Sequence, residues 1–370
     1  MAIKNSNSLQ RVLRYGLAYL AIFAIGAHTD SCKTNLIVDT DIFSDVESVQ
    51  SSHSSSIKLS RLRSDILLSD VAALLLAATL PNVSLLAVNV NYPSAYSALA
   101  ASAVLNHYGH PNTSIGLRRP YNNESFFDDW AYGLGEYASK IAYHYSGGSL
   151  PWFTPERSWD PVRLYRRMLA ESADESVTIA SIGFFDNLSG LLNSSGDAYS
   201  PLTGPELITK KVKKLAVMGG GYPSGHEFNF FGDNPLTTAH VVNNWPRDVP
   251  VTFLGTEVGD EVLTGAKLTT EGPKGDLARA AYGWYVGYNT TRMSWDPLTV
   301  AYAVMGLGSW FEYRNTAGYN HVLANGSNVW VADESVTNQH YLQLAKDNAT
   351  VANELDELYL KGVQRFSEGK

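Results

Sequence analysis

Short apolar runs alternate with longer apolar segments along most of this chain. The short runs are bounded by glycine and polar residues, as buried strands are, and lie at Asn35–Val38, Leu85–Val90, Val177–Ile182, Leu215–Met218 and Val251–Leu254. The longer segments predict helices at Val71–Thr79, Ala95–Tyr108, Pro235–Trp245, Leu277–Tyr288 and Pro297–Met305, with a closing helix at the C-terminal end. Strand-like residues around Asn325-Gly326 predict a hairpin. This alternation predicts an α/β fold, an open and mostly parallel Rossmann-like sheet with helices on both faces.

Residues 1–30 have the pattern of a secretory signal peptide. A basic front precedes an apolar run, Leu17–Ala27, that is too short to span a bilayer comfortably, although an uncleaved anchor is the alternative. We therefore expect residues 33–370 to form a single secreted domain that has no stable membrane association after cleavage. Cys32 is the only cysteine, so an internal disulfide is excluded.

Sequons for N-glycosylation support the secretory interpretation. They lie at Asn82, Asn112, Asn123, Asn187, Asn193, Asn289, Asn325 and Asn348. A buried asparagine cannot be modified, so we expect a glycoprotein in which some of these positions are unused.

The charge of the chain argues against a nucleic-acid partner. The net charge is −8, and the lysines and arginines form no basic stripe. The expected partner is instead a small molecule, and homo-oligomerisation is left open.

An acidic stretch follows the first predicted strand. Asp39, Asp41 and Asp45 lie within seven residues, directly after the apolar run Leu36–Val38. Ligands bind at the carboxyl ends of strands in open α/β sheets, and a hard cation with oxygen ligands would neutralise such a cluster. The alternative is a helix-capping turn whose extra acids are solvated.

The segment Val46–Ser69 interrupts this region. It contains nine serines and separates a strand end from the following helix, where connections of about 2–6 residues are usual. Its composition predicts a disordered insert. A retained intron is the preferred explanation, and an inserted flexible loop or a binding loop are the alternatives.

Blocks of residues that follow one another in order resemble the inosine/uridine-preferring nucleoside hydrolase family, in its secreted fungal form. The blocks are Asp39-Thr40-Asp41, Asp70-Val71-Ala72, Gly183-Phe184-Phe185-Asp186-Asn187, Met218-Gly219-Gly220-Gly221 with Glu227-Phe228-Asn229, and Trp295-Asp296-Pro297. The resemblance implies hydrolysis of the N-glycosidic bond of ribonucleosides, to ribose and free base, by a calcium-bound water. The insert splits the first motif, so that one of its acids falls on Ser69 or Glu47.

The same resemblance assigns roles to individual residues. Asp41 would be both the catalytic base and a calcium ligand. The other metal residues would be Asp70, Asp296, Asp186 through its backbone carbonyl, and Asp45, with Asp39 in a supporting position. Glu227 and Asn229 would bind the ribose hydroxyls, and Asn91 could replace an asparagine that the family has after the second strand.

The sequence departs from the family where the leaving base would be protonated. Trp295 stands where purine-acting members have a histidine, and tryptophan can stack on a base or simply pack. His226 and His240 are alternative acids, although a lone histidine is more often structural. Two other interpretations therefore stay open: a non-catalytic riboside- or glycan-binding protein on the same scaffold, and a metal-free glycosidase with two carboxylates.

Overall fold

The computed structural model describes residues 33–42, 69–124 and 134–367. The predicted signal peptide, Asp45 and nearly all of the predicted insert lie outside the described residues. Contacts group Thr34–Lys370 into one compact unit. None of the described helices is long and apolar enough to cross a membrane.

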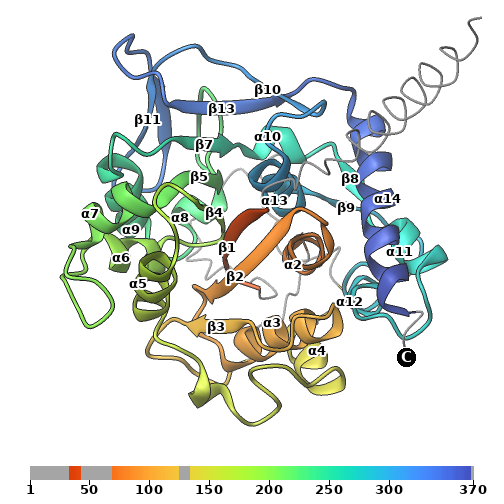
Figure 1. Ribbon diagram of the computed structural model, residues 1–370. Coiled ribbons are helices and arrows are strands. Elements are labelled where there is room, and N and C mark those ends of the chain that lie inside the picture. Colours follow the sequence, from red (N-terminus) through yellow and green to blue (C-terminus); the bar gives the residue numbers. More distant parts are fainter. Residues whose placement is uncertain (1–32, 43–68, 125–133, 368–370) are drawn as a thin grey trace, which may run out of the picture. The chain divides into compact units, whose positions relative to one another are not determined.

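A mixed sheet runs through the middle of this unit (Figure 1). Within the described residues it has eight strands, in the order β10-β13-β7-β5-β4-β1-β2-β3. All neighbours pair in parallel except β10 and β13. The strands are β1 (Thr34–Thr40), β2 (Val83–Val90), β3 (Ser114–Leu117), β4 (Val177–Ile182), β5 (Val212–Met218), β7 (Val251–Leu254), β10 (Phe311–Tyr313) and β13 (Gln339–Leu344). The predicted fold class is therefore confirmed.

The strand order reverses direction between β1 and β4. From β1 the chain proceeds outward through β2 and β3, and then returns to the other side of β1 with β4 and β5. In open α/β sheets such a switch point leaves a crevice at the carboxyl ends of the two strands, where ligands bind. A ligand-binding site is therefore expected at the carboxyl ends of β1 and β4.

Helices cover both faces of the sheet, because successive residues of each buried strand point to opposite faces. Leu36 and Val38 pack in one core and Ile37 in the other. The first core includes α2 (Ser69–Thr79), α3 (Ala95–His107), α4 (Ala138–His144), α11 (Ala266–Glu271), α12 (Leu277–Tyr285), α13 (Trp295–Met305) and α14 (Asn348–Ser367). The second includes α5 (Pro161–Glu171), α6 (Asp186–Leu192), α7 (Gly204–Lys211) and α9 (Pro235–Asn244). These two groups of helices lie on opposite sides of the sheet in Figure 1.

Shorter elements complete the unit. They are the 3₁₀ helix η1 (Pro155–Arg157), α8 (Phe228–Phe231), α10 (Thr256–Gly259), β6 (Ser224–Gly225), β8 (Leu263–Thr264), β9 (Arg292–Met293), β11 (Tyr319–Val322) and β12 (Asn328–Val331). The predicted hairpin is present, since β11 and β12 pair antiparallel around Asn325-Gly326.

Several helices start where the local sequence dictates. Asp160 caps α5 by accepting a hydrogen bond from the backbone of Arg163, and Pro161 occupies the first position, where no backbone donor is needed. Ser94 caps α3 in the same way. By contrast, α2 is buried along its whole length, so it depends on packing between the sheet and neighbouring helices.

Candidate functional site

Three carboxylates meet beyond the carboxyl end of β1. Asp41 follows β1, Asp70 lies in the first turn of α2, and Asp296 lies in the first turn of α13. All three residues are fully buried. Each of Asp41 and Asp70 feels the charge of another member of the group, which raises its pKa beyond the increase caused by burial. The structure thus brings together side chains that are 29 and 226 residues apart in sequence (70 − 41 and 296 − 70).

Hydroxyl groups hold two of the three carboxylates. Thr40 donates to Asp70 through Oγ1, and Ser69 donates to Asp296 through Oγ. Ser69 is the last residue of the predicted insert, yet it is buried and begins α2. The predicted C-terminal boundary of the insert is therefore one residue too late, because Ser69 belongs to the buried start of α2.

The carboxylate group suits a hard cation by its chemistry. Both carboxylate oxygens of Asp41, Oδ2 of Asp70 and Oδ1 of Asp296 are buried without a hydrogen-bond partner. Burial raises the pKa of all three groups well above the usual range for aspartate. A cation would offset this desolvation and satisfy these oxygens. However, no three His, Cys, Asp or Glu side chains of the described ranges form a group that could hold a metal as they stand.

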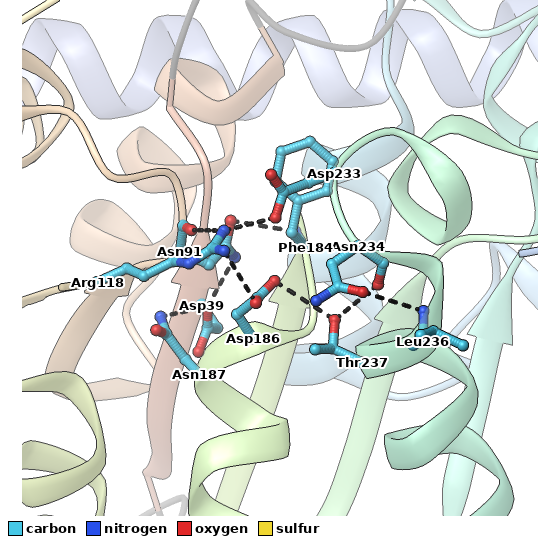
Figure 2. A network of polar contacts seen from close by, with 10 residues as sticks. All are labelled: Asp39, Asn91, Arg118, Phe184, Asp186, Asn187, Asp233, Asn234, Leu236 and Thr237. Atoms are coloured by element: carbon cyan, nitrogen blue, oxygen red, sulfur yellow. Dashed lines mark hydrogen bonds and ion pairs between the residues drawn. The ribbon is translucent and has the colours of Figure 1, made fainter. Parts of the chain in front are cut away.

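Asp39 is the centre of a separate, fully satisfied network. Oδ1 accepts from Asn91 Nδ2 at 2.7 Å and from Asn187 Nδ2 at 3.2 Å, as Figure 2 shows. Oδ2 accepts from the Tyr165 hydroxyl at 2.7 Å. Burial raises the pKa of Asp39 to about 7, although these hydrogen bonds lower it. The supporting role that the resemblance implies for Asp39 stays a prediction.

Asn91 ties this network to the turn after β4. Its Oδ1 accepts from the backbone N–H of Phe184 at 3.1 Å, so both ends of the amide are used within the protein. The same turn approaches the backbone of Asp41 closely. A Cβ added to Gly183 would lie 2.7 Å from Asp41 N and 2.9 Å from Asn91 Nδ2. Asn91 therefore acts here as a structural link.

Asp186 opens α6, and its side chain contacts residues outside the group of three carboxylates. Its carboxylate pairs with Arg118 at 3.0 Å and accepts from the Thr237 hydroxyl at 3.4 Å (Figure 2). Burial raises the pKa of Asp186 to about 6, while Arg118 lowers it. The role predicted from the resemblance concerns the backbone carbonyl of Asp186, and it stays a prediction.

Glu227 and Asn229 lie at the start of α8, after β5. Glu227 is the N-cap, and its two carboxylate oxygens accept from Asn229 N at 2.8 Å and Gly220 N at 2.9 Å. Burial raises the pKa of Glu227 to about 7. The negative charge of Glu227 also raises the pKa of Asp296, which connects this block to the three carboxylates. Oδ1 of Asn229 is buried without a partner, so it is available to a ligand hydroxyl.

Trp295 packs inside the protein. Its side chain is 2% exposed, and its indole N–H donates to the Thr256 carbonyl at 2.7 Å and to Asp260 at 3.1 Å. These contacts match the packing interpretation of Trp295, because both the ring and its donor are used internally. The candidate histidines also have local contacts. His226 is stacked on Phe231, and the ring of His240 is 2.9 Å from the Ser189 hydroxyl.

One sequon belongs to the site. Asn187 is buried and uses its Nδ2 to bond Asp39, so a glycan at that nitrogen is incompatible with the fold. Sequence reasoning gave no role to Asn187 or Tyr165, whereas Ser69 had been one of the two positions on which an acid of the first motif could fall. Asn187 carried a signal, since it follows Asp186 in the turn that the resemblance had already marked, and Tyr165 carried none.

Comparisons with solved structures give the class of fold. An inosine-uridine preferring nucleoside hydrolase from Bacillus anthracis covers 89% of this chain and 100% of its own, with a TM-score of 0.58 and 15% identity. A purine-preferring ribonucleoside hydrolase from Gardnerella vaginalis covers 89% and 99%, with a TM-score of 0.58 and 16% identity. The type III effector protein XopQ, solved in complex with adenosine diphosphate ribose, covers 95% and 99%, with a TM-score of 0.58 and 14% identity.

No model of a known protein family matches the chain, and no curated protein sequence matches it either. The chain has the nucleoside hydrolase fold, and the resemblance predicted from its motifs is confirmed at the level of the fold.

Proposed function

We propose that this protein hydrolyses the N-glycosidic bond of ribonucleosides or related N-ribosides, to ribose and the free base. The observation that carries the proposal is the group of Asp41, Asp70 and Asp296 at the switch point of the sheet, in which four of the six carboxylate oxygens are buried without a hydrogen-bond partner. The fold shared with nucleoside hydrolases supports it. Solved relatives with this fold supply the class of reaction, and the residues supply the chemistry.

Calcium is the cation that we assign to the three carboxylates, because it accepts six to eight oxygen ligands in flexible geometry. When bound, calcium would lower the pKa of a water ligand, and it could also coordinate hydroxyl groups of the sugar. Asp41 would take the proton of the attacking water, which is the role that the resemblance to the family gives to this position. Asn229 and Glu227 receive the ribose hydroxyls, which holds the sugar as positive charge develops at its anomeric carbon.

Departure of the base determines which ribosides suit the site. Tryptophan cannot donate a useful proton, and the N–H of Trp295 is already bonded to the Thr256 carbonyl. We therefore propose that ribosides with good leaving groups, such as nitrophenyl riboside, react faster than inosine. A strong preference for inosine would mean that another residue donates the proton, and His226 would be the first to mutate.

The packed Trp295 also favours one alternative, a riboside-binding protein without turnover. One experiment separates the two functions. Release of ribose from nitrophenyl riboside and from inosine is measured with calcium and with a chelator, while calorimetry measures ribose binding. Hydrolysis predicts calcium-dependent release that Asp41→Asn abolishes. Ribose binding without release by the wild-type protein would support the binding function instead.

We further propose that the protein acts outside the cell as a glycoprotein. The signal-like pattern of residues 1–30 supports this, as do the exposed sequons at Asn82, Asn112, Asn123, Asn193, Asn289 and Asn325. Mass spectrometry of the secreted protein tests it, with glycans expected at exposed sequons and none at Asn187.

A further inference from the structure

Arg118 joins three segments at the carboxyl edge of the sheet (Figure 2). It follows β3, and its backbone N–H continues the ladder by donating to the Val90 carbonyl at 3.0 Å. Its guanidinium lies 3.0 Å from Asp186 Oδ1 and 2.5 Å from Asp233 Oδ2. It also donates to the Asn91 carbonyl at 3.4 Å. One side chain thus spans the ends of β2 and β3, the start of α6 and the loop between α8 and α9.

Two of these partners lead to the carboxylate group. Asn91 holds Asp39 at one end of its amide and the backbone of Phe184 at the other. Asp186 begins α6 three residues after Gly183, whose Cα lies against the backbone of Asp41. Arg118 therefore contacts the turn after β4 directly through Asp186 and indirectly through Asn91. That turn lies next to the backbone of Asp41.

The third partner leads to the ribose-recognition block. Asp233 follows α8, the short helix that Glu227 caps and on which Asn229 lies. It precedes Asn234, which caps α9 by accepting from the backbone of Leu236. The position of α8 along the sheet edge is thus tied through Asp233 to the same guanidinium.

Arginine is suited to this task by its shape. Its planar fork contacts two carboxylates at once, whereas a lysine ammonium is a single point charge. The Arg118 side chain is 24% exposed and Asp186 is 14% exposed, so this pair is shielded from water more than a surface ion pair. The arrangement also places two carboxylates around one cation, so loss of the cation leaves the two acids facing each other.

We propose that Arg118 is a positioning residue, which sets the spacing between the carboxylate group and the Glu227–Asn229 block. The inference rests on the proposed function. Arg118 touches none of the reacting atoms in this scheme and acts through Asn91, Asp186 and Asp233. Loss of a partner that orients a metal ligand typically costs 10- to 100-fold in metal affinity or activity, and we expect an effect of this order from the loss of Arg118.

The test compares Arg118→Gln, Arg118→Lys and Asp233→Asn with a matched control. Arg166 is another arginine that ties a loop, since it donates to Ser194 and to the carbonyls of Ser200 and Leu202. None of these partners belongs to the site. Thermal unfolding, kcat and KM for nitrophenyl riboside, and the affinity for ribose are measured for each protein.

We expect Arg118→Gln to raise KM and the ribose dissociation constant by about 10- to 100-fold, with partial rescue in Arg118→Lys. We expect Asp233→Asn to raise KM and the ribose dissociation constant by a smaller factor. If Arg118→Gln fails to fold, the proposal is tested with Asp233→Asn instead. Combining Asp233→Asn with Arg118→Gln adds less than the sum of the two, because both remove the same pair. Arg166→Gln lowers the melting temperature but leaves KM and ribose affinity unchanged.

Two outcomes separate this inference from the proposed function. Wild-type turnover with unchanged kcat, KM and ribose affinity in the Arg118 and Asp233 variants overturns the inference alone. Ribose binding without turnover in the wild type, weakened by Arg118→Gln and not by Arg166→Gln, overturns the proposed function and supports the inference. Wild-type protein that neither binds nor releases ribose overturns both.

Discussion

Gly183→Ala is expected to damage the site through a single added methyl group. The new Cβ would lie 2.7 Å from Asp41 N and 2.9 Å from both Asn91 side-chain termini. Ordinary contact needs about 3.5 Å, so the turn and the end of β1 must separate by about 0.8 Å. Overpacking of this kind costs about 1–3 kcal/mol of unfolding free energy. A misplacement near 1 Å costs about 100-fold in rate, so we expect a 10- to 100-fold loss of kcat/KM.

The assay pairs release of ribose with thermal unfolding. Gly283→Ala is the matched control, since Gly283 lies within α12 and a Cβ there meets nothing within 4 Å. That change should raise stability by about 0.5–1 kcal/mol and leave kcat/KM alone, because alanine favours a helix interior over glycine. Wild-type activity and melting temperature in Gly183→Ala would show that the close approach does not fix the position of Asp41.

The other predictions concern single side chains. Asp41→Ala should abolish ribose release while the circular dichroism spectrum stays that of a folded protein, and near-normal release would mean that the base is elsewhere. Trp295→Phe removes the hydrogen bonds to Thr256 and Asp260, so it should cost about 1–3 kcal/mol in denaturant unfolding with KM unchanged, whereas a raised KM would indicate base stacking. Asp356 accepts from Gly265 N, and burial raises its pKa to about 6 from 3.8. Because the pKa of Asp356 is higher in the folded state, the free energy of unfolding falls as the pH rises from about 4 to 6. Asp356→Asn should flatten that decline and raise the free energy of unfolding at pH 7 by up to about 3 kcal/mol. An unchanged pH profile of unfolding would refute this.

The sheet could be predicted because its strands are buried on both faces. Such strands appear as continuous apolar runs, and β4 and β7 begin and end where the sequence predicted. Polar or mixed elements were missed. β13, Gln339–Leu344, contains two glutamines and a histidine, and α5 contains three arginines among its apolar residues. The Asp160-Pro161 start of α5 was a usable signal, since it is a cap followed by a first-turn proline.

The site was predictable only where local sequence fixes its position. Asp39 lies near the end of β1 and Asp41 directly follows it, so the topology of the sheet fixes both at its carboxyl edge. Tyr165 comes from a helix on the second face, and its hydroxyl reaches Asp39 only after that helix packs. The orientation of Trp295 likewise depends on Thr256 and Asp260, which no spacing relates to it.

The contact between Ser69 and Asp296 has a consequence for how the chain acquires its activity. The two residues are 227 positions apart, so the loop that their contact closes contains most of the fold. Closure of long loops is entropically costly and makes folding slow, so local helices and neighbouring strands form earlier. The carboxylate group is therefore incomplete until α13 has been synthesised and has packed against α2. A nascent or truncated chain that ends before α13 holds only two of the three acids, so it lacks the complete carboxylate group on which the proposed function rests.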